Sequence, residues 1–424
     1  MPRRPDPVAA LSGALVLALV LGLGGCSADD GPPGATEPGR LTARDDDAIP
    51  AVADVLGRLL DRRAAAVRAG DRAAFRRGLD PSDPAFVAGQ ETWLSNLRQL
   101  PLADLRYALD PGSLVRHGRS YRATVTVSLR LARYDAAPVV TRARYRFAPD
   151  HGRLRLASVD HLVGRQPPAL QPWDLGPVQV SEGAGVLVVS DAGSAAQADG
   201  VVTAVEQGIA AVAPRVPRPW DRRVVVYALS GTTFLRTLTN VPGGDPLAVD
   251  ALTFPVLGGA GGRSVAATRV LLSPRLLSED GPARDRLIRH ELVHVALGPH
   301  DDRIPVWLSE GLAEYLSVRD VPPAERSISG EALEAARAGL TELPADATFN
   351  GPHSSRNYGV AWWVCEAIVE QYGEQVLWSL VDALGTSDDP GRDLERLLDT
   401  REGDLVRRAG DLMLATYEHA EPPP

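Results

Sequence analysis

Five consecutive residues, His290-Glu291-Leu292-Val293-His294, carry the side chains of this chain that are best suited to chemistry. In a helix, two histidines four residues apart lie about 40° from each other around the axis and one turn apart along it. Both imidazoles can then reach one metal ion at about 2.0–2.1 Å. Glu291 projects beside them, close enough to hold a water molecule without being a ligand itself. The pattern therefore indicates a metal site with an adjacent carboxylate.

The surrounding residues predict a buried helix from Arg284 to Leu297 that ends at Gly298-Pro299. Apolar side chains cover most of its circumference, yet three ionisable groups share one sector. Buried polar groups cost free energy unless they are paired or bind a metal. A metal site therefore explains these residues better than two hydrogen-bonded core histidines would.

A third ligand is expected on a neighbouring element. Residues 305–316 form a second helical pattern, and Glu310 within it follows His294 by 16 residues. That spacing is enough for a loop and a helix that returns antiparallel to the first. Glu314 lies one turn beyond Glu310 on the same face, and it competes for the ligand role.

The segments His290-Glu-Leu-Val-His294 and Trp307-Leu-Ser-Glu310-Gly-Leu-Ala-Glu314-Tyr together resemble the gluzincin metallopeptidases, the thermolysin and aminopeptidase clan, in their small bacterial peptidase-MA-like branch. The resemblance covers about residues 178–420 and is strong across 287–316. It implies that His290, His294 and Glu310 bind zinc and that Glu291 is the general base. Glu314 is then expected to accept a hydrogen bond from the far nitrogen of His290 or His294.

The resemblance implies hydrolysis of peptide bonds, in which Glu291 activates a zinc-bound water that attacks the scissile carbonyl. A donor must stabilise the oxyanion that forms, and the candidates are Tyr358, at the start of a long helix, and His353, five residues earlier. The only methionines are Met1 and Met413, so the chain has no G-x-M-E-N-type motif, which in the aminopeptidases recognises the free amino terminus of a substrate. We therefore expect an endopeptidase and not an aminopeptidase. The alternative is an envelope binding or scaffolding lipoprotein whose metal site is vestigial or structural.

The beginning of the chain has the features of a secretory signal over residues 1–26, with a basic start and an apolar run from Val8 to Leu23. Its last residues, Leu23-Gly24-Gly25-Cys26, resemble the lipobox of bacterial lipoproteins. This implies lipidation at Cys26 and an anchor on the extracytoplasmic face of the cell membrane. Residues 27–49 are acidic and rich in small residues, which predicts a disordered linker. With Cys26 modified, Cys365 is expected to be a buried free thiol.

The rest of the chain predicts two α+β units. Residues 50–163 change from helical spacing to the period-two alternation of strands, best seen from Tyr121 to Leu129. Their order resembles the cone-shaped folds related to nuclear transport factor 2, which serve either as spacer or docking domains or as ligand-holding ones. A proline-rich linker is predicted over 164–177, a zincin-like catalytic unit with a small mixed sheet over 178–420, and a tail over 421–424.

The composition limits the partners. The chain has 45 basic and 54 acidic residues, for a net charge of −9, which disfavours binding to nucleic acid. His117, His151 and His161 have no spacing typical of metal ligands and are expected at the surface or locally hydrogen-bonded. The expected partners are a peptide or protein substrate and the membrane that holds the lipid anchor, and the sequence leaves the oligomeric state open.

Overall fold

The structure is a computed structural model that describes residues 48–161, 170–239, 241, 244–258, 264–279, 281–322 and 325–418. The predicted signal, Cys26 and all but the last two residues of the predicted linker over 27–49 lie outside these ranges. The contacts group the described residues into one compact unit. No helix in the described part of the chain is long and apolar enough to cross a membrane.

The first part of the unit is a group of helices packed on an antiparallel sheet, as the change of period predicts. Its elements are α2 (Ala48–Ala69), α3 (Arg72–Arg77), α4 (Pro84–Leu97), β1 (Leu102–Leu109), β2 (Val115–His117), β3 (Ser120–Leu131), β4 (Val139–Asp150) and β5 (Arg153–His161). Asp83 begins α4 by accepting a hydrogen bond from the Phe86 amide, and Pro84 follows at the first helical position. The mixed α+β class expected from the sequence is confirmed.

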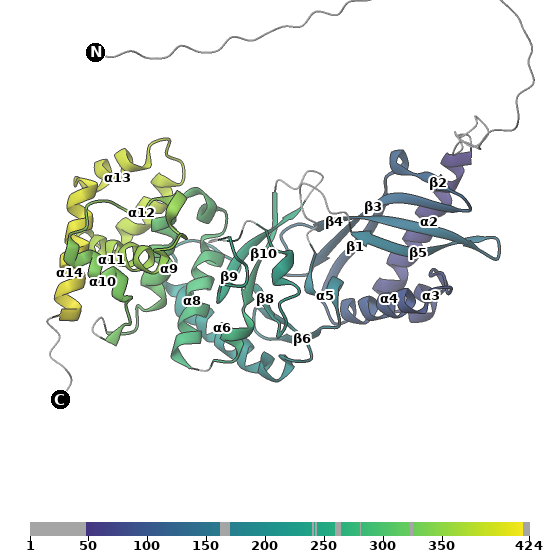
Figure 1. Cartoon of the computed structure of the whole chain (residues 1–424), viewed down its shortest axis with the longest axis horizontal. Coiled ribbons are helices and arrows are strands. Elements are labelled where there is room, and N and C mark those ends of the chain that lie inside the picture. The colour runs from purple at the N-terminus through teal and green to yellow at the C-terminus, as the bar shows by residue number, and fades with distance from the viewer. Residues whose placement is uncertain are drawn as a thin grey trace, which may run out of the picture. The chain divides into compact units, whose positions relative to one another are not determined.

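The second part alternates strands and helices and then becomes helical. Its elements are α5 (Pro172–Leu175), β6 (Gln179–Glu182), β7 (Val186–Ser190), α6 (Ala198–Val212), β8 (Val224–Ala228), β9 (Ala251–Gly258), β10 (Ser264–Leu272), α7 (Pro274–Leu277), α8 (Pro282–Leu297), α9 (Val306–Ser317), α10 (Gly330–Ala338), α11 (Ser354–Tyr372), α12 (Glu374–Leu384), α13 (Pro390–Leu398) and α14 (Glu402–Glu418). Figure 1 shows the order of these elements along the chain.

One mixed sheet runs through both parts, in the order β1-β3-β4-β9-β10-β8-β7-β6. Strands β7, β8 and β10 are parallel to their neighbours in this set, while β9 is antiparallel to β10. The two parts join where Val139 of β4 pairs with Gly258 of β9. Alternate residues of β7 face opposite cores: Val186 and Val188 face the helices α6 and α8, whereas Leu187 and Val189 join the core of the first part.

The end of the predicted proline-rich linker is packed rather than extended. Residues 162–169 lie outside the described ranges, but Trp173 is buried in the core shared by the two parts. The buried side chain of Asn96 in α4 donates to the carbonyls of Trp173 and Gly176, at 3.0 and 2.8 Å, and accepts from the Val178 amide at 3.1 Å. Because these bonds satisfy buried backbone groups, the segment is fixed against α4.

A fully buried ion pair also crosses the junction. Arg269 on β10 donates to the Asp135 carboxylate at 2.6 Å, and neither side chain is exposed. Asp135, in the turn after β3, also accepts from the Leu131 amide at 2.7 Å, while the Arg269 Nε donates to the Tyr227 hydroxyl at 3.1 Å. Both charges are therefore paired and hydrogen-bonded, as buried charges must be.

The helices around α8 approach one another closely at two glycines. A Cβ atom on Gly208 of α6 would lie 2.6 Å from the Leu292 side chain of α8. A Cβ atom on Gly311 of α9 would lie 2.4 Å from the Ala361 carbonyl oxygen of α11. Glycine at these positions lets α6 lie against α8 and α9 lie against α11 (Figure 1). Cys365, on α11, is buried as expected.

Candidate metal centre

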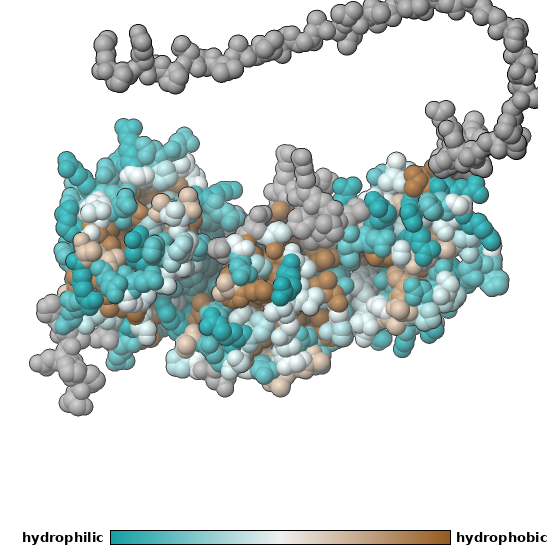
Figure 2. Space-filling view, viewed as in Figure 1, coloured by the Kyte–Doolittle hydropathy of each residue, from teal (hydrophilic) through white to brown (hydrophobic). Residues whose placement is uncertain are grey.

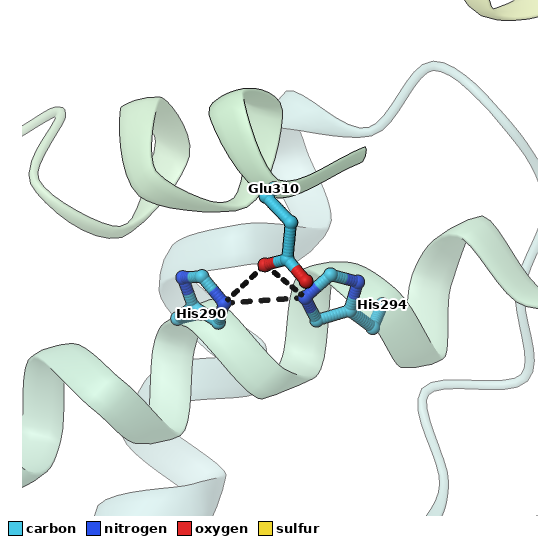
Figure 3. Close-up of side chains that lie close together, drawn as sticks. All are labelled: His290, His294 and Glu310. Carbon is cyan, nitrogen blue, oxygen red and sulfur yellow. Dashed lines mark hydrogen bonds and ion pairs between the residues drawn. The ribbon is translucent and has the colours of Figure 1, made fainter. Parts of the chain in front are cut away.

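Two histidines and a glutamate from neighbouring helices bring their ligand atoms together. His290 and His294 lie on α8, which begins at Pro282 and ends at Leu297. Gly298 follows with a φ of 55°, a positive value that glycine adopts readily. Glu310 lies on α9, which packs against α8. The two Nε2 atoms are 3.2 Å apart, and the Glu310 Oε2 lies 3.2 Å from the Nε2 of His290 and 3.4 Å from that of His294 (Figure 3). These three residues can hold a metal ion.

These separations match a tetrahedral site. With bonds of about 2.0–2.1 Å to zinc, two ligand atoms at tetrahedral positions lie about 3.3–3.4 Å apart. The three observed separations, 3.2, 3.2 and 3.4 Å, are close to this value. No other described group of three histidine, cysteine or acidic side chains converges in this way. The atoms of this group thus stand at the spacing that one small divalent cation requires.

The outer nitrogen of His290 faces a second carboxylate. Its Nδ1 lies 3.2 Å from the Oε1 of Glu314 on α9, although the N–H is not aimed well enough at this oxygen for a hydrogen bond. Glu314 also pairs with Arg286, one turn before His290 on α8. Glu314 therefore lies behind the ligand group, on the far side of the His290 ring, and not within the group itself.

The outer nitrogen of His294 faces a carboxylate that the sequence analysis missed. Asp301, in the turn between α8 and α9, has both carboxylate oxygens 3.1 Å from the His294 Nδ1. Ser309, the residue before Glu310, donates its hydroxyl to the same carboxylate. A carboxylate that accepts from Nδ1 fixes the tautomer and leaves the Nε2 lone pair free. Glu314 lies in the corresponding place beside the Nδ1 of His290, so both Nε2 atoms can face one cation.

The charges around the site act in the same direction. Burial by itself lowers the pKa of His290, but the carboxylates of Glu310 and Glu314 outweigh it and raise that pKa to about 9. Burial also lowers the pKa of His294, and Asp301 and Glu310 raise it well above its usual value. Burial raises the pKa of Glu310, yet the two histidines hold it far below its usual range. The site therefore stabilises positive charge, which either protons or a metal ion can supply.

Glu291 lies beside the ligand group and is held from the neighbouring strand. The Thr253 hydroxyl on β9 donates to the Glu291 Oε2 at 2.7 Å and lies 3.1 Å from the Glu291 carbonyl oxygen. Among the described residues, only Thr253 hydrogen-bonds this carboxylate. One carboxylate oxygen is thus fixed, and the other can accept a proton from a water molecule.

Of the two candidate oxyanion donors, the structure brings only Tyr358 to the site. Its ring centroid lies 6.2 Å from that of His290, and its hydroxyl lies 3.3 Å from the Asn350 side-chain oxygen. Burial raises the pKa of Tyr358, and the charges of Glu310, Glu291 and Glu314 raise it further, so the phenol keeps its proton. His353 is exposed at the start of α11, and no contact joins it to the ligand group.

Two of the residues that complete the site, Asp301 and Thr253, were not found from the sequence. Asp301 had one available signal, since it is an acidic residue within the short connection that follows His294. Thr253 had none, because the strand β9 was not predicted and its position beside Glu291 depends on the packing of α8 on the sheet. No protein-family model matches the sequence, and no curated protein matches it either.

Proposed function

We propose that this protein is a zinc-dependent peptidase of the gluzincin kind, with His290, His294 and Glu310 as ligands and Glu291 as general base. The observation that carries the proposal is the convergence of two Nε2 atoms and one carboxylate oxygen beside a buried Glu291. A structural metal site closes its coordination with four protein ligands, whereas a hydrolytic site has three and keeps one position open. Three ligands next to a free carboxylate therefore favour hydrolysis.

Zinc is the ion that the donor atoms favour. Imidazole nitrogens suit zinc, copper, iron and nickel, while magnesium and calcium prefer a shell of oxygen atoms. Two imidazoles and one carboxylate form the ligand set of several zinc hydrolases. Both outer nitrogens face carboxylates, Glu314 and Asp301, and such partners raise the basicity of the ligand imidazoles.

The chain's own residues supply the remaining steps of peptide hydrolysis. When bound, zinc would polarise the scissile carbonyl and lower the pKa of a water molecule. Glu291, oriented by Thr253, accepts the proton of the attacking water and passes it to the leaving amine. Tyr358, which stays protonated, donates a hydrogen bond to the oxyanion.

A peptide substrate is favoured by the strand that holds Glu291. Along residues 251–257 of β9, one edge pairs with β10 and the other pairs with no described strand. An extended peptide binds such an edge through backbone hydrogen bonds. Hydrophobic residues gather on the surface over β9 and β10 (Figure 2), where the paired residues Leu257 and Val265 are both exposed. A strand edge that pairs with no described strand, with exposed apolar side chains beside it, suits a polypeptide.

The proposal extends to the whole chain. The segment 178–420 would be a zincin-like catalytic unit. Residues 50–163 would form a cone-shaped domain related to nuclear transport factor 2, which serves the catalytic unit as a spacer or as a docking domain. Lipidation at Cys26 would place the protein at the extracytoplasmic face of the cell membrane. The edge of residues 251–257 that pairs with no described strand supports an endopeptidase, because such an edge accommodates a chain that continues on both sides of the scissile bond.

The test compares Glu291→Gln with the unchanged protein on casein and on a quenched peptide library, with and without a chelator. Glu291→Gln should keep zinc in a 1:1 ratio, measured by mass spectrometry, and lose about 100- to 10,000-fold in kcat/KM, as expected for loss of a general base. Glu334→Gln, which removes an exposed carboxylate from α10, is the matched control and should cleave normally.

Each outcome points to one function. Equal cleavage by the unchanged protein, by Glu291→Gln and by the chelated protein would refute a metallopeptidase. Stoichiometric zinc with no cleavage of any library peptide would favour the alternative, a binding or scaffolding lipoprotein with a vestigial or structural metal site.

A further inference from the structure

We propose that the open face of the sheet in the first part of the chain is a docking surface for an acidic segment of the polypeptide substrate. This inference rests on the peptidase function proposed above, and it assigns the docking role to residues 50–163. The residues concerned lie on β1, β3 and β4 and point away from the core. We name them the arginine face: Arg106, Arg122, Arg130, Arg142, Arg144 and Arg146.

The alternation of side chains along these strands places the six arginines on one face. Ala143 and Tyr145 of β4 belong to the core of the first part, so the even-numbered residues of this strand point the other way. The register carries the same division to β3, where Arg122 lies opposite Arg146. The side chains of four of these arginines are exposed, those of Arg122, Arg130, Arg142 and Arg144.

The four exposed arginines have no partner among the described residues. Arg122, Arg130, Arg142 and Arg144 make no hydrogen bond or ion pair with this part of the chain. Arg122 and Arg146 moreover stand directly opposite each other on neighbouring strands, where like charges destabilise a sheet. An anionic ligand would remove this repulsion and pair the free guanidinium groups.

The arginine face is positive in an acidic protein. Over the register of β3 from Arg122 to Arg130, the acidic residues that share this face among the described residues are Asp104 on β1 and Asp160 on β5. Asp104 pairs with Arg106 at 2.8 Å. Six arginines and two aspartates give the face a net charge of +4, whereas the whole chain carries −9.

The arginine face continues to the proposed catalytic centre. Val139 of β4 pairs with Gly258 of β9, and opposite residues of an antiparallel pair point to the same side of the sheet. Val139 and the alternate residues of β9 before Gly258 share one buried cluster, on the side away from the arginines. Thr253 and Leu257 of β9 therefore lie on the side of the arginines, and Thr253 holds Glu291.

The chain itself limits the distance between the two sites. Thr253 precedes Gly258 by five residues, and Arg142 follows Val139 by three. At about 3.4 Å per residue and about 5.5 Å between paired strands, the Cα atoms of Thr253 and Arg142 lie at most about 33 Å apart. About ten residues of extended peptide cover this distance. A substrate whose scissile bond lies at Glu291 can therefore reach the arginine face with a segment about ten residues away.

The chemistry of the arginine face suits a run of carboxylates. Arg142, Arg144 and Arg146 recur at every second residue of β4, which is also the side-chain period of an extended peptide. A guanidinium group binds a carboxylate through two parallel N–H···O bonds. Thr124 and Thr126 lie on the same face of β3 and add hydroxyl donors. The continuity with a site for peptide bonds favours a polypeptide as the source of these carboxylates.

The test is a binding titration with the protein of residues 27–424, which contains the compact unit and lacks the predicted lipid anchor. Three fluorescent peptides share one sequence except for a short run of glutamate, glutamine or lysine. At low salt, the glutamate peptide should bind about tenfold more tightly than the glutamine peptide, since several exposed charge pairs of modest strength add up, and added salt should reduce this ratio. Arg142→Gln/Arg144→Gln should bring the ratio close to one.

Two further variants make the result specific. The matched control, Arg58→Gln/Arg62→Gln, removes two exposed arginines from α2, which packs on the other face of the sheet, and should keep the ratio. The charge reversal Arg142→Glu/Arg144→Glu should make the lysine peptide the tightest ligand. Loss of folding cannot produce such a reversal.

A cleavage measurement tests the connection to the proposed catalytic centre. In a peptide that the zinc-loaded protein cleaves, a glutamate run about ten residues from the scissile bond should lower KM about tenfold and leave kcat within about twofold. Arg142→Gln/Arg144→Gln should abolish the change in KM. Because the titration needs no cleavage, a preference for glutamate without any cleavage would count against the peptidase function and not against the docking surface.

Four results would overturn the docking surface. The first is equal binding of the glutamate and glutamine peptides, and the second is a preference that survives Arg142→Gln/Arg144→Gln. The third is a preference that appears only when Asp45, Asp46 and Asp47 are replaced by asparagine, because the chain's own acidic segment would then occupy the face. The fourth is binding to phosphatidylglycerol vesicles through the same arginines with no discrimination among the peptides, which would assign the face to the membrane.

Discussion

Asp301 is the residue whose replacement tests the geometry of the site most directly. It touches no proposed ligand atom, yet its carboxylate holds the Nδ1 of His294 through two contacts of 3.1 Å and also accepts from Ser309. Replacement by asparagine keeps the size of the side chain and removes its charge. Replacement by alanine removes both the charge and the contact that orients the ring.

The expected magnitude follows from these two functions. Loss of a group that orients a metal-binding histidine lowers metal affinity by about 10- to 100-fold, or about 1.4–2.7 kcal/mol. The Asp301 side chain is 24% exposed, so water already screens part of its charge. We therefore expect Asp301→Asn to weaken zinc binding by about tenfold and Asp301→Ala by nearer to 100-fold.

The assay is competition for zinc between the metal-free protein and a chromophoric chelator at constant pH. Asp302→Asn, at the exposed neighbouring position, is the matched control and should bind zinc like the unchanged protein. Glu314→Gln should resemble Asp301→Asn, because Glu314 stands in the corresponding place at His290. Glu310→Gln should exceed all of these losses, because it removes a ligand and its charge.

The reasoning would be refuted if both Asp301 variants bound zinc within twofold of the Asp302→Asn control. The assignment of the two glutamates would be reversed if Glu310→Gln kept stoichiometric zinc while Glu314→Gln lost it. Circular dichroism and thermal unfolding of each metal-free variant would separate a local loss of affinity from unfolding.

Three further predictions concern packing, charge and pH. Gly311→Ala should lower the free energy of unfolding by about 1–3 kcal/mol in denaturant unfolding and weaken zinc binding, because its Cβ would lie 2.4 Å from the Ala361 carbonyl oxygen. The control Gly57→Ala, at a position with open space, should instead raise the free energy of unfolding by about 0.5–1 kcal/mol. Equal effects of the two substitutions would contradict the close packing of α9 on α11. Asp135→Asn should cost about 3–5 kcal/mol in the same measurement, since it leaves the buried Arg269 charge unpaired, and a loss below about 1 kcal/mol would contradict that burial. Because the pKa of metal-free His290 is raised to about 9, a proton must leave this histidine when zinc binds. Between about pH 6 and 8, zinc affinity should therefore rise about tenfold per pH unit for each proton that zinc displaces. A zinc affinity that does not change with pH would contradict this coupling.

The sequence by itself determined the part of the site that one helix contains. The spacing of His290, Glu291 and His294 fixes their relative directions wherever the chain is helical, because those directions depend only on the 3.6-residue turn. The proline and glycine that bound this helix are equally local signals. The alternation from Tyr121 to Leu129 predicted β3 for the same reason, since the side-chain period of a strand is a property of the backbone.

The choice between Glu310 and Glu314 required the tertiary structure. Both lie on one face of α9, and only the way α9 packs on α8 sets Glu310 against the two Nε2 atoms and Glu314 against the outer nitrogen of His290. Contacts of Thr253 and Asp301 likewise join residues from different elements.

The relation between the two parts of the chain was also decided in three dimensions. The prolines after residue 164 predicted a linker, but local composition carries no information about distant partners. Asn96 hydrogen-bonds the end of that segment, and Asp135 pairs with Arg269 across 134 positions of sequence. A buried polar group must find its partner wherever the fold provides one, so the continuity of the sheet and core could be read only from the assembled structure.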